Sequence, residues 1–207
     1  MEPTVAKSLL PNSLVSQAQS QSRGEFVEAI DTPLLLIRVG GADTELALGL
    51  SEAPTAGGTR LLPTLGFNTI VGEAPEPSKR FVAPASTAFD GARVAFLLAQ
   101  SLYFAAPLRK RTIAGKPFAE RISVGRATNN DIVLRDGSVS KFHAWFECDD
   151  DDAYYVGDAR STNTTALNGT VVTGSELVRL RPGDELRFGA VEAVLCPPDI
   201  LWDALVG

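Results

Sequence analysis

The pattern of apolar and polar positions changes near residue 101 of this 207-residue chain. Beyond that point short apolar segments recur, and stretches such as RDGS, DDDD and RPGD separate them with turn-forming residues. Short strands at regular spacing with turn signals between them are typical of an all-β sandwich or barrel. The segments are LYFAAPL, RISVGR, DIVL, HAWFEC, AYYVGD, ALNG, TVV, LVRL, ELRFG and VEAVLC.

Two helices are predicted at the borders of this β-rich region. The stretch FDGARVAFLLAQSLYF (89–104) predicts a helix that begins after Asp90 as its N-cap, because its apolar residues recur at helical spacing. The face of that helix is predicted from Val94, Leu97, Leu98 and Ser101. The final segment PPDILWDALVG (197–207) predicts a short amphipathic helix with proline at its start.

The first hundred residues show weaker patterns. Residues 1–24 are polar and predict a disordered lead or a loose helix. Residues 33–50 predict two strands joined by a glycine-containing turn. We therefore expect an N-terminal extension, 1–100, of uncertain α/β structure, followed by a mainly β domain, 101–207, that ends in a short helix.

Charge narrows the range of partners. The formal net charge is −6, and residues 116–207 carry it with 9 basic and 15 acidic residues. A negative chain lacks the positive surface that nucleic-acid binding requires. The run DDDD (149–152) predicts a solvated hairpin tip, since it lacks the alternating acids and the glycine of a calcium loop. The basic run RKR (109–111) predicts a solvated strand end.

Cysteine content and hydropathy bear on the compartment. Cys148 and Cys196 fit no metal spacing, lie in apolar segments and are expected to be buried free thiols. The N-terminus lacks a basic region followed by an apolar core. The longest apolar run, 94–108, falls short of the ~20 residues that cross a bilayer. We expect a soluble, cytoplasmic protein that does not bind membranes, metals or cofactors.

Three motifs in the β-rich half carry the candidate chemistry. They are GR (125–126), SVSKFH (138–143) and DARSTNTTALNG (158–169). If their loops meet at one end of a sandwich, Arg126 and Lys141 can form charge-assisted bonds to a phosphate dianion. Hydroxyl groups of Ser140 and Thr162 can add further bonds, and the Asn163 amide can hold a peptide backbone.

With these residues in place, the sequence resembles the forkhead-associated (FHA) family over roughly residues 101–196. The resemblance rests on the motifs GR, SKFH (140–143), STNT (161–164) and NG (168–169), and on NNDIVL and RPGDELRFG. It implies an eleven-stranded FHA-like β-sandwich that binds phosphothreonine peptides through its end loops. The binding residues that it implies are Arg126, Ser140, Lys141, Thr162 and Asn163. The structural residues that it implies are Gly125, His143, Asn168 and Gly169.

Two positions depart from the family pattern. Lys141 replaces a residue that is often arginine, so a point charge stands where a planar fork is common. Thr164 replaces the usual glycine after the asparagine, and a β-branched residue is strained where φ is positive. Peptide-backbone recognition by Asn163 depends on how this loop folds.

The single histidine, His143, has three candidate roles: a catalytic base, a metal ligand or a buried hydrogen-bonding residue. No nucleophile–base pair and no second ligand accompany it in the sequence, so the buried role is favoured.

The expected function is a phosphothreonine-dependent binding module in Ser/Thr kinase signalling, without catalysis. The alternative is an FHA-fold scaffold or interaction domain that no longer needs phosphate. An enzyme within residues 1–100 is disfavoured, because that segment has no histidine, cysteine or glycine-rich phosphate loop.

Overall fold

A computed structural model describes residues 12–39, 88–101, 103–111, 121–173 and 177–207. The chain divides into two units: residues 1–49 with 88–207 form the first, and residues 50–87 form the second. The second unit lies outside the described residues, and so do the predicted second strand of 33–50 and the start of the predicted polar lead. The fold below is that of the first unit.

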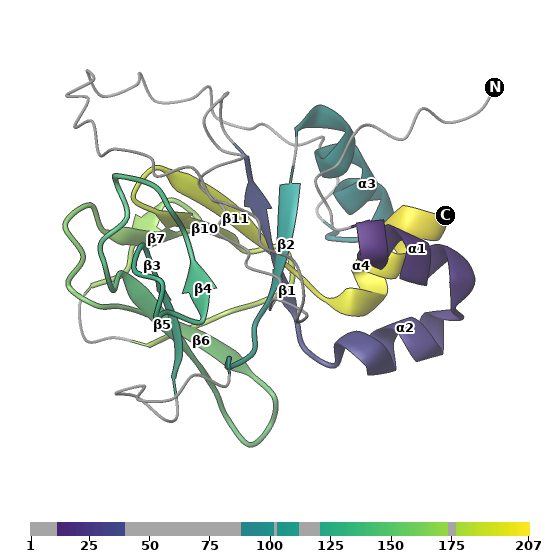
Figure 1. The fold of residues 1–207 in the computed structure, drawn as a ribbon, viewed down its shortest axis with the longest axis horizontal. Coiled ribbons are helices and arrows are strands. Elements are labelled where there is room, and N and C mark those ends of the chain that lie inside the picture. The colour runs from purple at the N-terminus through teal and green to yellow at the C-terminus, as the bar shows by residue number, and fades with distance from the viewer. Residues whose placement is uncertain (1–11, 40–87, 102, 112–120, 174–176) are drawn as a thin grey trace, which may run out of the picture. The chain divides into compact units, whose positions relative to one another are not determined.

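Eleven strands among the described residues form two sheets (Figure 1). The first sheet has the order β2-β1-β11-β10-β7-β8, and the second has the order β4-β3-β5-β6-β9. The strands of the first sheet are β1 (Leu34–Arg38), β2 (Tyr103–Pro107), β7 (Thr165–Leu167), β8 (Thr170–Val171), β10 (Glu185–Phe188) and β11 (Val191–Cys196). Those of the second are β3 (Ile122–Gly125), β4 (Ile132–Val133), β5 (Ala144–Cys148), β6 (Tyr154–Asp158) and β9 (Val178–Arg179).

All ten apolar segments predicted as strands form strands, so the predicted β-sandwich with a C-terminal helix is confirmed. Its core lies between the sheets, because one face of every long strand is apolar. Leu35, Phe188 and Leu195 contribute to this core from the first sheet, and Val124 and Phe146 contribute from the second.

Strand β1 comes from the segment expected as an N-terminal extension, yet it lies inside the first sheet. It pairs antiparallel with β11 on one side and with β2 on the other. Leu35 and Ile37 face the core, and Leu34 and Leu36, on the opposite face, are also buried. A strand buried on both faces cannot be removed without exposing both layers, so a boundary at residue 101 would cut through this sheet.

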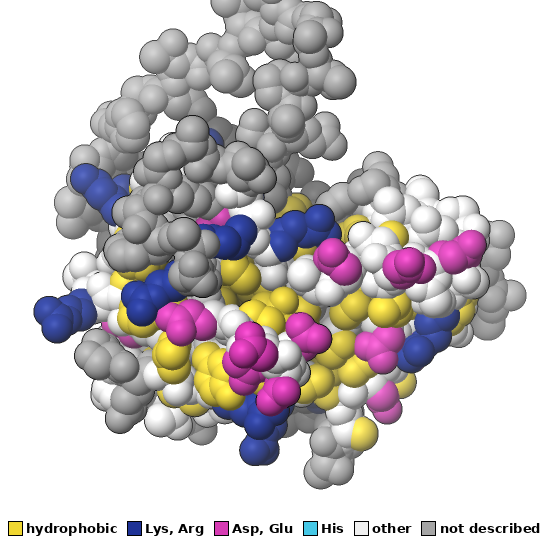
Figure 2. Space-filling view, turned by 90° about the horizontal axis from the view of Figure 1, so that it is seen from below, with side chains coloured by type: hydrophobic (Ala, Val, Ile, Leu, Met, Phe, Trp, Pro, Cys, Tyr) yellow, Lys and Arg dark blue, Asp and Glu magenta, His cyan; other side chains and the backbone are white. Residues whose placement is uncertain are grey.

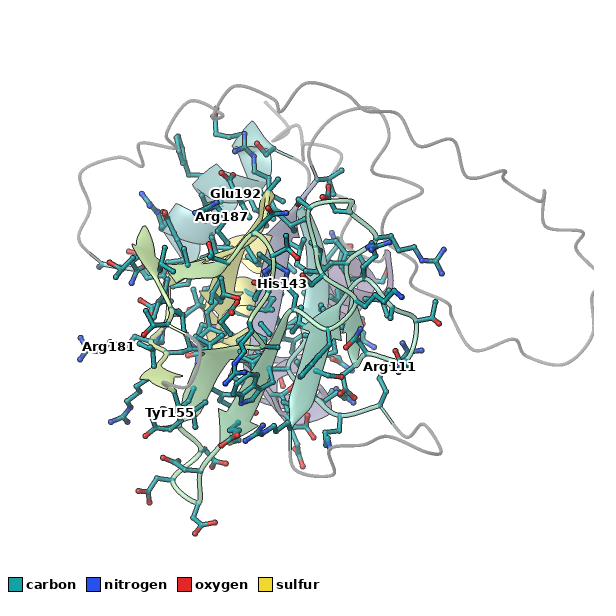
Figure 3. The ribbon with its side chains drawn as sticks, turned by 90° about the vertical axis from the view of Figure 1, so that its left-hand side faces the viewer. Arg111, His143, Tyr155, Arg181, Arg187 and Glu192 are labelled. Carbon is teal, nitrogen blue, oxygen red and sulfur yellow. The ribbon has the colours of Figure 1, made fainter. Side chains whose placement is uncertain are left out.

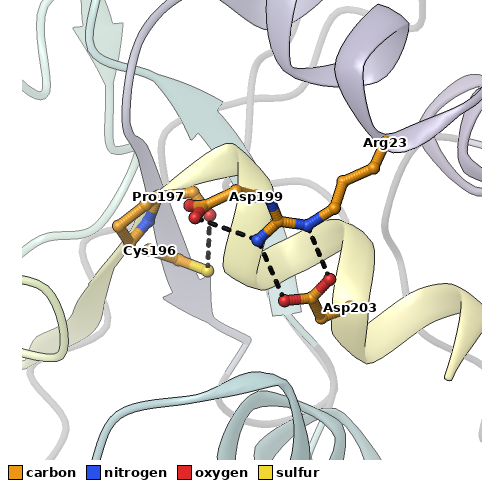
Figure 4. Close-up of polar contacts among 5 residues, drawn as sticks. All are labelled: Arg23, Cys196, Pro197, Asp199 and Asp203. Carbon is orange, nitrogen blue, oxygen red and sulfur yellow. Dashed lines mark hydrogen bonds and ion pairs between the residues drawn. The ribbon is translucent and has the colours of Figure 1, made fainter.

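In the part of the chain that the structure describes, four helices lie beside β1 and β2 (Figure 1): α1 (Asn12–Ser20), α2 (Arg23–Ile30), α3 (Gly91–Gln100) and α4 (Pro198–Val206). Helix α4 contacts each of the others. Arg23 joins α2 to α4 through Asp203 at 2.9 Å and Asp199 at 3.2 Å (Figure 4). These ion pairs are exposed and contribute little to stability, so apolar contacts are what hold the four helices together.

Helix α3 begins as predicted, since the Asp90 side chain accepts a bond from the Arg93 amide at 2.9 Å. Val94, Leu97 and Leu98 are buried. Ser101 does not extend that face, because the helix ends at Gln100 and Ser101 has extended backbone with φ −151°. The loss of helical geometry at the C-cap explains this difference.

The acidic run Asp149–Asp152 connects β5 to β6 as an exposed hairpin tip, as predicted. Figure 2 views the molecule from below and shows acidic side chains gathered among apolar ones.

The prediction of two buried thiols is wrong for Cys148, which is exposed, whereas Cys196 is buried. Cys148 lies on the same face of β5 as the core residues Ala144 and Phe146. It is the last residue of the strand, however, and lies beyond the edge of the core. Burial raises the pKa of the Cys196 thiol.

Candidate functional site

Three loops meet at one end of the second sheet. Ala144, the first residue of β5, pairs with Val124 near the end of β3 and with Asp158 at the end of β6. The loop 126–131 after β3, the loop 134–143 before β5 and the loop 159–164 after β6 are therefore neighbours. Backbone bonds join them, from the Arg126 amide to the Ser140 carbonyl at 2.9 Å and from the Ala159 amide to the His143 carbonyl at 2.9 Å.

His143 lies under these loops and is fully buried (Figure 3). Its Nδ1 accepts a bond from the Ser140 amide at 3.0 Å, and its Nε2 lies 3.2 Å from the Thr164 carbonyl oxygen. Because Nδ1 accepts, Nε2 carries the proton and donates to Thr164. Burial lowers the pKa of His143, against smaller opposing effects of the Thr164 carbonyl and Asp158. Both ring nitrogens are thus committed to the backbone of two loops.

Ser140 and Thr162 lie in contact across the two loops. The Thr162 amide donates to Ser140 Oγ at 3.1 Å, and the two hydroxyl oxygens are 3.5 Å apart. Thr162 is exposed and Ser140 is partly exposed, so both hydroxyls can reach a ligand. The structure therefore brings together two hydroxyls that are 22 positions apart in the sequence.

The two cations of the motif lie beside these hydroxyls. Arg126 is exposed, and its Nε donates to the Val139 carbonyl oxygen at 3.1 Å, which fixes the base of the guanidinium. The terminal guanidinium nitrogens have no partner among the described residues. Lys141 is exposed, and its carbonyl oxygen accepts a bond from the Ala127 amide at 3.2 Å. An anion at the loop tips would meet both charges.

Asn163 and Thr164 show how the departure from the family pattern is accommodated. Thr164 has φ 55°, which is the left-handed conformation that glycine adopts most easily. The loop therefore keeps this conformation despite the β-branched side chain. The Asn163 side chain donates to the Ser138 carbonyl oxygen at 2.8 Å, which uses one amide hydrogen and leaves the other exposed.

Gly125 is placed where a side chain does not fit. A Cβ atom there would lie 2.8 Å from Asn130 Nδ2 and 2.9 Å from the Lys141 carbonyl carbon. Asn130 is buried, and its amide donates to the Ala127 and Lys141 carbonyl oxygens at 2.8 and 2.6 Å. Asn130 lies in the segment NNDIVL (129–134), whose sequence alone did not indicate this supporting role.

Asn168 and Gly169 lie away from the other motif residues. They form the turn between β7 and β8 with φ values of 50° and 80°, at the end of β7 remote from Thr164. Asn168 donates to Asp184 Oδ1 at 2.8 Å and accepts from the Glu185 amide at 2.8 Å. The structure thus places these two residues in a turn and not at the loop cluster.

Sequence reasoning missed Asp158, which organises the third loop. One of its oxygens accepts from the Ser161 and Thr165 hydroxyls at 2.6 and 2.7 Å, and Asp158 is buried. Burial alone would raise the pKa of this carboxyl, but the hydrogen bonds from Ser161 and Thr165 outweigh it and hold the pKa below its usual range. An Asp three residues before a Ser is a turn signal that could have found it.

Within the described ranges, no group of three or more His, Cys, Asp or Glu side chains could hold a metal ion. No helix in that part of the chain is long and apolar enough to cross a membrane.

Comparison with known proteins identifies one family. Residues 122–189 match the family model of the FHA domain. This range contains the three loops and their strands β3 to β10. No curated protein matches the chain in sequence.

Solved structures that are similar to the chain include FHA domains. One, studied for phosphothreonine-dependent FHA domain interactions, has 25% identity and a TM-score of 0.37, and the match covers 44% of this chain and 82% of that one. EmbR of Mycobacterium tuberculosis, in complex with a low affinity phosphopeptide, has 28% identity, coverage of 45% and 21%, and a TM-score of 0.37. The MEK1 FHA domain with a HOP1 peptide has 26% identity, coverage of 45% and 87%, and a TM-score of 0.36.

Proposed function

Residues 122–189 are an FHA domain, and on that premise we propose that this chain is a phosphothreonine-dependent binding module. Its ligand is a phosphothreonine-containing protein or peptide, held by the three loops at the end of the second sheet. The proposed phosphate ligands are Arg126, Ser140, Lys141 and Thr162. Asn163 is proposed to hold the peptide main chain with its remaining amide hydrogen and its carbonyl oxygen.

The contact between Ser140 and Thr162 carries this proposal. Their hydroxyls lie 3.5 Å apart on two loops, within reach of neighbouring oxygens of one phosphate. Arg126 and Lys141 supply two positive charges in the same loop cluster, since the Arg126 amide bonds to the Ser140 carbonyl oxygen and Lys141 follows Ser140. Charge-assisted bonds from Arg and Lys, completed by hydroxyl donors, suit a tetrahedral dianion better than a planar carboxylate.

The loop cluster supports binding and not catalysis. His143 is the only histidine of the chain, and both its ring nitrogens bond to backbone atoms. It therefore cannot accept a proton from Ser140 or Thr162 as a general base. We propose that the domain grips the phosphate group and leaves its ester bond intact.

We further propose that the chain acts in Ser/Thr kinase signalling in the cytoplasm. A phosphothreonine reader reports the output of a kinase by docking its product. This part of the proposal follows from the ligand chemistry alone. The alternative is an FHA-fold scaffold that binds its partner without phosphate.

A binding titration with an Arg126→Ala variant tests the assignment. A phosphothreonine peptide selected from a degenerate library should bind the variant about thirtyfold more weakly, since a charge-assisted contact is removed. Arg181→Ala is the matched control, because Arg181 is exposed and follows β9 at the end that pairs with Tyr155, away from the loop cluster.

Equal affinity of a folded Arg126→Ala protein would remove Arg126 from the site. Retained binding of the unphosphorylated peptide would favour the scaffold.

A further inference from the structure

The second sheet sets four cations in a row across one end. The strand order is β4-β3-β5-β6, and β3 and β4 are parallel, so both end at the loop cluster. Arg135 follows β4, Arg126 follows β3, Lys141 precedes β5 and Arg160 follows β6, each within three residues of its strand. Neighbouring strands lie about 4.8 Å apart, so the row spans about 14 Å.

The outer two of these cations have no role in the proposed phosphate site. Arg135 and Arg160 are exposed, and neither has an ion-pair partner among the residues that the structure describes. The residue before each arginine forms a backbone hydrogen bond that holds it in the loop cluster. The Leu134 amide donates to the Gly125 carbonyl at 3.0 Å, and the Ala159 amide donates to the His143 carbonyl at 2.9 Å.

The carboxylates of the same loops are already engaged. Asp131 and Asp158 are buried, and each accepts bonds from neighbouring amide and hydroxyl groups. Asp136 is partly exposed and accepts from the Ser138 amide and hydroxyl at 2.8 and 2.5 Å. The charges that this end offers to a ligand are therefore mainly positive, although the chain as a whole has a net charge of −6.

The exposed acids of the hairpin tip, Asp149–Asp152, lie at the other end of the same strands. β5 and β6 pair from Ala144–Asp158 at the loop cluster to Cys148–Tyr154 at the tip. This distance is about 14 Å at a rise of about 3.4 Å per residue. It exceeds the Debye length of about 8 Å at physiological salt, so the tip does not neutralise the row.

We propose that the site selects phosphothreonine in an acidic sequence context, with Arg135 and Arg160 as the residues that read the acidic flanks. This inference rests on the proposed function. With the phosphate between Arg126 and Lys141, an extended peptide lying along the row has its next one to three residues on each side close to an outer arginine. Basic residues on either side of the phosphothreonine would be repelled by Arg135 and Arg160.

Three synthetic peptides test this selectivity, each with a central phosphothreonine flanked on both sides by three Glu, three Ala or three Lys residues. Fluorescence anisotropy should give the order Glu, then Ala, then Lys. The Glu-flanked peptide should bind about tenfold tighter than the Ala-flanked one, because each exposed pair gives a few-fold gain. The preference should shrink at high salt.

The double variant Arg135→Gln/Arg160→Gln should lose most of this preference and still bind the Ala-flanked peptide. The matched control Arg179→Gln/Arg181→Gln, at the tip end of β9, should keep the preference. Thermal melts of both variants should match the wild type.

The outcomes separate the two claims. Equal affinity for the Glu- and Ala-flanked phosphopeptides, or a double variant that keeps the preference, overturns the role of the flanking arginines and leaves the phosphothreonine reader intact. Failure of all three phosphopeptides, or equal binding of an unphosphorylated Glu-flanked peptide, overturns both.

Discussion

Gly125 and Lys141 approach each other so closely that no side chain fits between them. A Cβ atom at Gly125 would lie 2.9 Å from the Lys141 carbonyl carbon, and the Lys141 carbonyl oxygen also accepts bonds from Ala127 and Asn130. This contact fixes the distance between the loop that carries Arg126 and the loop that carries Ser140. The geometry of the proposed phosphate site depends on it.

Gly125→Ala should therefore destabilise the fold by about 2 kcal/mol or more, because backbone atoms must move to admit the methyl group. Urea unfolding measures this change. Gly137→Ala is the matched control, since a Cβ atom at Gly137 meets nothing within 4 Å. Equal stability of the two variants would contradict the close contact.

Thr164→Gly should stabilise the protein by about 0.5–1 kcal/mol, because glycine adopts a positive φ without the Cβ clash. Thr164 has φ 55°. The bond from His143 Nε2 to the carbonyl oxygen of residue 164 should persist, and phosphopeptide affinity should change little. Thr164→Ala serves as the control, since alanine keeps the clash and should gain nothing. A loss of stability in the glycine variant would show that the threonine side chain supports the loop.

The pKa of His143 predicts that stability falls with acidification. Burial lowers this pKa below 6.5 in the folded protein, so the unfolded chain binds the proton more readily. Stability is then fully present above pH ~6.5 and is lost as the pH falls below it. Urea unfolding at pH 7 and 5.5 should show this loss.

His143→Gln isolates the contribution of that group, because the chain has no other histidine. The variant should be less stable at pH 7 by about 1–3 kcal/mol, since buried partners lose their bonds. Its stability should also change less between pH 7 and 5.5 than that of the wild type. An unchanged pH dependence would show that His143 does not titrate as its burial implies.

Local patterns predicted most of the elements but not their partners. Each of the ten apolar segments after residue 101 contains a strand, because alternation and turn residues act within a few positions. The place of β1 between β2 and β11 could not be predicted, since its partners lie about 70 and 160 positions away along the chain.

The loop cluster was predictable in its exposed residues and not in its buried supports. Arg126, Ser140 and Thr162 stand in motifs, and the structure brings their loops together. The supporting roles of Asp158 and Asn130 could not be predicted, because their hydrogen bonds form only once the chain has turned and the loops are packed together. Cys148 could not be predicted as exposed for a similar reason. Its exposure depends on where the core ends along β5, which the local sequence does not show.

The central claim is that the ligand must carry a phosphate dianion. One peptide is to be titrated in three forms, with phosphothreonine, threonine or glutamate at the central position, at pH 5, 6 and 7.5. Arg126 and Lys141 stay protonated throughout this range, and the second ionisation of the phosphate lies near pH ~6.

Calorimetric titration of these three forms tests the account most directly. The phosphothreonine peptide should bind far more tightly than the other two at pH 7.5, because glutamate offers one charge and a planar pair of oxygens. Its affinity should fall as the pH drops from 7.5 to 5, since the phosphate gains a proton. Equal affinity for the phosphothreonine and threonine forms at pH 7.5 would contradict the account and favour a phosphate-independent scaffold.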